Sequence, residues 1–165
     1  MSSARFEHFI WGIVCLVVYV WLKKRRGDRL LLHPLALAVA VPVLYLGTVL
    51  PDWDMTVFGI GRHRNPLFHS ALLYFCLAWL WRKSDLAEIT YNIGEAYLNV
   101  VVHVGLTLGL VSHLALDVWQ YGDVRWIPGG TLGNLWLSGH ALLLGLVAWY
   151  PQYALSPPEK PWSTL

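Results

Sequence analysis

The sequence predicts an all-α fold, an integral membrane helical bundle of about five transmembrane helices. Of the 165 residues, 56% are hydrophobic and only 13% are charged, whereas soluble domains carry about 25% charged residues. The mean hydropathy is +0.49, and long apolar runs follow one another along the chain, as in multi-pass membrane proteins. The net charge of +2 and the lack of a basic run interleaved with aromatic residues argue against nucleic-acid binding.

Five apolar runs are expected to form the helices of a single transmembrane helical domain, residues 1–150. They cover residues 9–22, 30–50, 66–81, 97–119 and 131–150. The first run is short for a span, which needs about 20 residues, so we expect its helix to begin near Arg5. Pro42 should kink the second helix. Residues 151–165 are rich in proline and are expected to form an extended tail.

The distribution of basic residues predicts the orientation in the membrane. If five helices alternate with the N-terminus outside, eight basic residues face the cytoplasm and four face the opposite side. The eight are Lys23, Lys24, Arg25, Arg26, Arg29, Arg82, Lys83 and Lys160, and the four are Arg5, Arg62, Arg64 and Arg125. This asymmetry agrees with the positive-inside rule. We expect a multi-pass protein of the inner (plasma) membrane or another energy-transducing membrane.

Polar residues that can bind metal ions interrupt these apolar runs at a few points. With the predicted orientation, they all fall at helix ends on the non-cytoplasmic side. The candidate metal ligands are His8, Asp52, Asp54, His69, His113 and Asp117. Polar groups in a membrane protein are costly and usually functional. We therefore expect a metal site at this face of the bundle.

The types and spacing of these residues indicate a chemistry. His113 and Asp117 are four residues apart, so a helix would place both on one face. Histidine and carboxylate ligands suit zinc, with manganese or magnesium as alternatives, and an open zinc site activates water near neutral pH. The six residues would suffice for two neighbouring ions, which assist phosphoester hydrolysis. Asp52 or Asp54 could then act as the catalytic base. Basic residues expected at the same face could hold a phosphate. They are Arg62, His63, Arg64 and Arg125.

Each feature also has a structural explanation. Leu-Pro-Asp after an apolar run is often a helix stop, with Asp52 or Asp54 capping the next helix. A histidine and an aspartate four residues apart are often simply a hydrogen-bonded pair. His103 and His140, which lie within apolar runs, are expected to form hydrogen bonds inside the bundle. The metal site is favoured because several segments, far apart in sequence, carry complementary ligands to one membrane face.

The same segments resemble a known family. The stretches LPDWD, HRNPLFHS and GLVSHLALD are similar to the LPDxD, HRGxTHS and GxxSHLxxD motifs of the membrane-bound metal-dependent hydrolases, the family of the LexA-regulated inner-membrane protein. That family is grouped with the zinc-dependent phospholipase C and P1 nuclease superfamily. The resemblance implies an all-helical fold and metal ligands at Asp52, Asp54, His69, His113 and Asp117. His8 matches the family's N-terminal histidine.

The chain departs from the family motifs at several positions. Met55 stands where many members have histidine, while Asn65-Pro66 and Phe68 replace glycine and threonine. These changes fall at positions that could bind metal or substrate. The sequence is therefore compatible with two functions. The first is a membrane-embedded, metal-dependent hydrolase that acts on a phosphoester near the membrane surface. The second is a non-catalytic accessory or scaffold subunit of a larger membrane complex, in which His103 or His140 could contact a haem or another pigment. The lipid bilayer is the expected partner in both.

Overall fold

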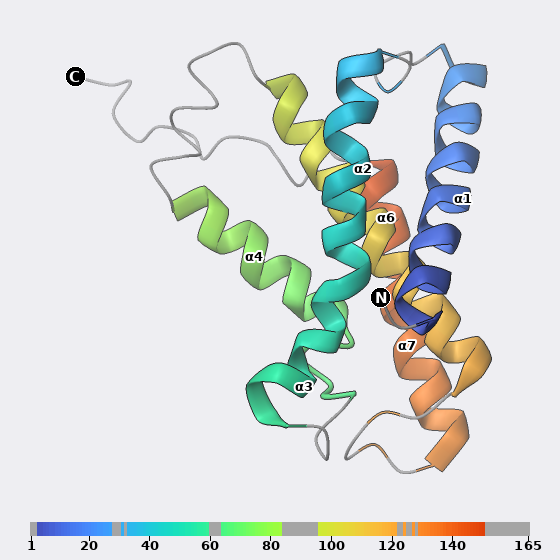
Figure 1. Ribbon diagram of the computed structural model, residues 1–165, viewed down its shortest axis with the longest axis vertical. Helices are drawn as coiled ribbons and strands as arrows, with labels where there is room; N and C mark the ends of the chain where they lie inside the picture. The colour runs from blue at the N-terminus through green and yellow to red at the C-terminus, as the bar shows by residue number, and fades with distance from the viewer. Residues whose placement is uncertain are drawn as a thin grey trace.

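A computed structural model describes residues 3–27, 31, 33–59, 64–83, 96–121, 124, 127 and 129–150. All regular structure within these ranges is helical, and the main elements are a bundle of five helices with two short helical segments after the second (Figure 1). The elements are α1 (Ser3–Arg25), α2 (Pro34–Val49), the 3-10 helix η2 (Leu50–Asp52), α3 (Trp53–Phe58), α4 (Ala71–Lys83), α6 (Ala96–Gln120) and α7 (Gly129–Trp149). The predicted all-α bundle is therefore confirmed.

Four helices in the described part of the chain are long and apolar enough to cross a bilayer. They contain the segments Arg5–Arg25, Pro34–Phe58, Val100–Gln120 and Gly130–Trp149. This indicates an integral membrane protein. The third predicted helix, over residues 66–81, begins later than expected, because Pro66 to His69 form turns. The resulting α4 has 13 residues, about 20 Å at 1.5 Å per residue, which is shorter than the hydrocarbon core.

The second apolar run also differs from the prediction. We expected one helix over residues 30–50, but α2 begins at Pro34, where proline needs no hydrogen-bond partner. His33 precedes it and accepts a hydrogen bond from the backbone N–H of Leu35 through Nδ1, at 3.3 Å. After Val49 the chain continues into η2 and α3. The aspartates predicted near the end of this run therefore lie on two further helical segments.

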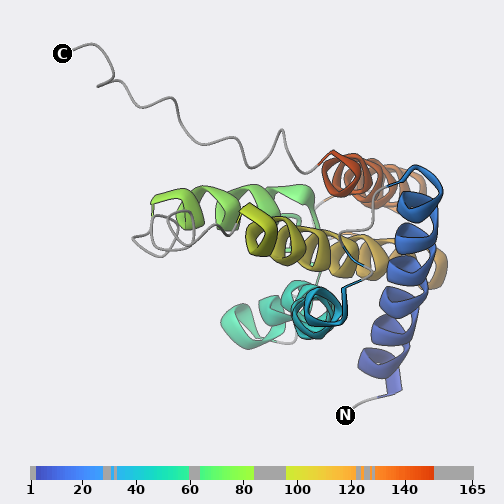
Figure 2. The ribbon, with the colours of Figure 1, turned by 90° about the horizontal axis from the view of Figure 1, so that it is seen from above.

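Helix α6 is the centre of the bundle. It contacts α1, α2 and α7, and viewed from above it lies between α2 and α7, with α1 and α4 towards opposite sides (Figure 2). In the apolar window of its membrane-spanning segment, 72% of the residues are buried, against 22–33% for the other three spans. Two of its hydroxyl side chains bond within the helix: Thr107 donates to the carbonyl of His103, and Ser112 to that of Gly109. Such internal bonds allow hydroxyl groups inside an apolar bundle.

Glycines bring α2 and α6 into direct backbone contact. A Cβ atom at Gly47 would lie 2.5 Å from the carbonyl oxygen of Leu106, and one at Gly105 would lie 2.8 Å from that of Ala40. A Cβ atom at Gly109 would overlap the carbonyl oxygen of Leu44. Small residues spaced in this way are common where membrane helices pack closely. This contact sets the distance between the end of α2 and the end of α6.

The two ends of the bundle differ in charge. At one end Lys23 donates a hydrogen bond of 3.0 Å to the carbonyl oxygen of Trp149, which joins the C-terminal ends of α1 and α7. Arg26 lies over the Trp149 ring there, at 4.8 Å. The C-terminal ends of α2 and α6 and the N-terminal end of α4 lie on the opposite side of the bundle (Figure 1). The candidate ligands from these elements therefore lie at the same end, opposite the basic cluster.

Candidate metal centre

The six predicted metal ligands come together in one buried cluster. α1 provides His8, η2 provides Asp52, α3 provides Asp54, the turn before α4 provides His69, and α6 provides His113 and Asp117. Their exposed fractions are 4%, 9%, 0%, 0%, 0% and 3%, respectively. The prediction that these residues converge is confirmed. Three buried carboxylates and three buried imidazoles in one place need charge compensation, because isolated charges are costly to bury.

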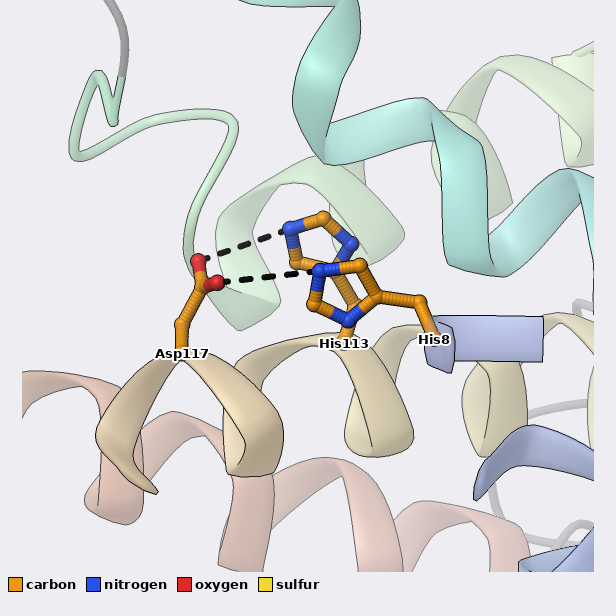
Figure 3. Close-up of side chains that lie close together, drawn as sticks. All are labelled: His8, His113 and Asp117. Atoms are coloured by element: carbon orange, nitrogen blue, oxygen red, sulfur yellow. Dashed lines mark ion pairs between the residues drawn. The ribbon is translucent and has the colours of Figure 1, made fainter. Parts of the chain in front are cut away.

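Asp117 connects the three histidines. Its Oδ2 atom lies 3.4 Å from Nε2 of His69 and 3.4 Å from Nε2 of His113, and its Oδ1 atom lies 4.0 Å from Nε2 of His8. The rings of His8 and His113 are stacked, with centroids 4.2 Å apart, and Figure 3 shows both facing Asp117. Nε2 of His113 also lies 3.8 Å from Oδ1 of Asp52. Imidazole nitrogens thus converge on carboxylate oxygens from separate helices.

These separations fit ligands around an ion better than direct hydrogen bonds. Hydrogen bonds between nitrogen and oxygen are usually about 2.7–3.2 Å long. Neighbouring ligand atoms on a tetrahedral zinc ion, with bonds of about 2.0–2.1 Å, lie about 3.3–3.4 Å apart. Nε2 of His113 and Oδ2 of Asp117 are buried and have no hydrogen-bond partner in the described part of the chain. The residues present therefore fit a divalent ion.

Two overlapping groups have the geometry of a metal site. The first is His8, His113 and Asp117, and the second is Asp52, His69 and His113. In each group the ligand atoms lie within 4.8 Å of one another. Asp52 makes no capping hydrogen bond to the start of α3. The explanation of Asp52 as a helix cap is therefore wrong.

Backbone groups orient two of the histidines. Nδ1 of His113 lies 2.8 Å from the carbonyl oxygen of Thr48 on α2. The backbone N–H of His69 donates to the carbonyl of Asn65, at 2.9 Å, and the carbonyl of His69 accepts from the indole of Trp136 on α7, at 3.1 Å. Metal-binding histidines commonly have their second ring nitrogen held as Nδ1 of His113 is here. Thr48 and Trp136 were not predicted, because backbone contacts leave no sequence signature.

Asn65 organises the turn that carries His69. Its backbone N–H donates to Oδ2 of Asp54 at 2.8 Å, and its side-chain oxygen accepts from the N–H of Leu67 at 2.9 Å. The hydroxyl of Ser70 then accepts from the N–H of Leu72 at 3.2 Å, which caps α4. Asn65, where the family motif has glycine, is therefore a structural part of the turn in this chain.

Three of the four predicted substrate-binding residues lie outside the described residues. They are Arg62, His63 and Arg125. Arg64 is described, and its guanidinium lies 3.8 Å from the ring centroid of Tyr121, just after α6. Its backbone has a φ angle of 59°, which is uncommon for a residue other than glycine. Such strain is often found at functional sites. Arg64 directly precedes Asn65, so it lies at the edge of the cluster.

The other histidines of the bundle lie outside the cluster. Nδ1 of His103 lies 3.0 Å from the hydroxyl of Tyr74, which confirms the predicted hydrogen bond within the bundle. The ring of His140 packs edge-on against Trp136, with centroids 4.4 Å apart. Its Nδ1 is buried with no hydrogen-bond partner in the described chain.

No protein-family model, curated protein or solved structure matches this chain. The resemblance to the membrane-bound metal-dependent hydrolases therefore remains a prediction from the three motifs.

Proposed function

We propose that the protein is a metal-dependent hydrolase of the membrane-bound type suggested by its motifs, acting on a phosphoester near the membrane surface. The observation that carries this proposal is the burial of three histidines and three aspartates in one cluster at one end of the bundle. A structural role alone gives no reason to gather so many costly polar side chains from five segments.

A divalent ion held by these residues, zinc in the first instance, would supply Lewis acidity and activate a water molecule. The two aspartates considered as catalytic base differ in position. Asp52 keeps 12% of its side chain exposed, whereas Asp54 is fully buried and accepts the N–H of Asn65. Asp52 is therefore the better candidate to accept a proton from water, through the carboxylate oxygen that does not bind the ion.

Arg64 is proposed to hold the phosphate of the substrate. Its guanidinium lies over the ring of Tyr121, and a guanidinium in this position still presents the N–H groups in its own plane, which can pair with phosphate oxygens. Its neighbour Asn65 contacts Asp54 directly. The phosphate would thus be held beside the carboxylates. The site is proposed to face the non-cytoplasmic side, opposite the basic end of α1.

The test is hydrolysis of bis(p-nitrophenyl) phosphate by the purified, zinc- or manganese-loaded protein. His113→Ala should reduce the rate by at least about 100-fold, because even the loss of residues that support a ligand typically costs about 10–100-fold. The control is His33→Asn. It changes a histidine at the other end of α2 and keeps a capping side chain, and it should hydrolyse at the wild-type rate.

The scaffold function predicts a different outcome. The wild-type protein would be inactive with either metal, His113→Ala would have no effect, and the chain would be purified with partner subunits at fixed stoichiometry. That result would reject the hydrolase. An absorption spectrum of the same preparation would detect a bound haem or other pigment.

A further inference from the structure

The two overlapping ligand groups share one residue, His113. If both groups were filled at once, His113 would have to bind two ions. An imidazole can bind two ions only when both of its nitrogens are available. The state of Nδ1 in His113 therefore decides how many ions the cluster can hold tightly.

Nδ1 of His113 is occupied. It lies 2.8 Å from the carbonyl oxygen of Thr48, and because a carbonyl can only accept, Nδ1 carries the proton. Only Nε2 then has a lone pair for a metal ion, and it faces Asp52 and Asp117 at 3.8 Å and 3.4 Å. One lone pair binds one ion. The two groups are therefore alternatives, and filling either one leaves the other with only two ligands.

His69 is arranged in the same way, with a carboxylate in place of the carbonyl. Its Nδ1 lies 3.5 Å from Oδ2 of Asp54, and its Nε2 lies 3.4 Å from Oδ2 of Asp117. The same Oδ2 atom of Asp54 accepts the N–H of Asn65 at 2.8 Å. Asp54 therefore lies behind His69, on the side away from Asp117. A carboxylate in this position typically orients a metal-binding histidine.

We infer that the cluster binds one divalent ion tightly through Asp52, His69 and His113, which leaves a coordination position for water, and that Asp54 is a positioning residue acting through His69. This inference rests on the metal site of the proposed function, but not on hydrolysis. It differs from the sequence expectation, which had a pair of ions and Asp54 as a ligand. His8, 4.0 Å from Asp117, completes the packing around His113 through the stacked rings.

The experiment is a titration of the metal-free, full-length protein in detergent with Zn²⁺, followed by calorimetry and by metal analysis after dialysis. We expect one tightly bound ion per chain. Asp52→Ala should abolish tight binding. Asp54→Ala should keep one ion with an affinity about 10–100-fold lower, and Asp54→Asn should recover part of the loss, because an amide oxygen can still accept a hydrogen bond.

Glu7→Gln is the matched control, because Glu7 is an acidic residue next to His8 that is exposed and accepts a hydrogen bond from Gln120. It should bind zinc like the wild type. Two tight ions per chain, or equal loss of binding in Asp54→Ala and Asp52→Ala, would overturn this inference and leave the proposed metal site standing. A wild-type protein with no tightly bound ion would overturn both.

Discussion

Replacement of Gly47 by alanine should damage both the bundle and the metal centre. The added Cβ atom would lie 2.5 Å from the carbonyl oxygen of Leu106 and 3.0 Å from Cα of Gly109, whereas ordinary contact begins at 3.4 Å. Both neighbours are backbone atoms, so no side-chain rotation relieves the overlap. The helices α2 and α6 would have to separate by about 0.9 Å, and overpacking of this kind costs about 1–3 kcal/mol of stability.

The same separation should weaken metal binding. Asp52 follows α2 directly, and His113 and Asp117 lie on α6, so the movement separates ligands on opposite sides of the site. Metal–ligand distances tolerate only about 0.2 Å. We expect the zinc affinity of Gly47→Ala to fall by about 10–100-fold, the range seen when the supports of metal ligands are removed.

The assay combines zinc titration with denaturation in detergent, and Gly139→Ala is the control. Gly139 is on α7, and a Cβ atom there would meet nothing within 4 Å. The control should match the wild type in zinc affinity and lose no stability. If Gly47→Ala bound zinc as tightly as the control and were equally stable, the close α2–α6 contact would not be what holds the ligands in place.

Three further predictions follow from other contacts. Tyr74→Phe removes the hydroxyl that bonds to His103 and should lower the free energy of unfolding by about 1 kcal/mol, measured by denaturation. Arg64→Gln should raise KM for bis(p-nitrophenyl) phosphate while the zinc affinity stays unchanged; weaker zinc binding would contradict its role as a phosphate contact. With both native cysteines removed, Trp53→Cys should react with an impermeant thiol reagent from the non-cytoplasmic side and Lys24→Cys should not. The reverse pattern would overturn the proposed orientation.

The convergence of the ligands was predictable because it depends on where apolar runs begin and end. His8, Asp52 and Asp117 each fall at a run boundary, and counting the boundaries places them at one end of a bundle. The spacing of Gly105 and Gly109 is also visible in the sequence and is typical of close helix contact. Coarse features of this kind follow from hydrophobic patterning, and they identified the six residues of the cluster.

The finer roles within the site could not be predicted. Asp52 and Asp54 look alike in the sequence. Only the path of the chain from η2 into α3 shows that Oδ1 of Asp52 faces His113, whereas Asp54 lies behind His69. The carbonyl of Thr48 and the N–H of Asn65 are backbone groups, which every residue has. The shortness of α4 depends on the turns after Pro66, which an apolar run conceals.

X-ray absorption spectroscopy of the zinc-loaded protein tests the proposed metal centre directly. The expected spectrum shows nitrogen and oxygen ligands at about 2.0–2.2 Å and the outer-shell scattering of two imidazole rings, from His69 and His113. The His113→Ala variant should lose the zinc. A wild-type spectrum without imidazole scattering, or zinc that remains bound unchanged in His113→Ala, would show that the buried cluster is not the metal site.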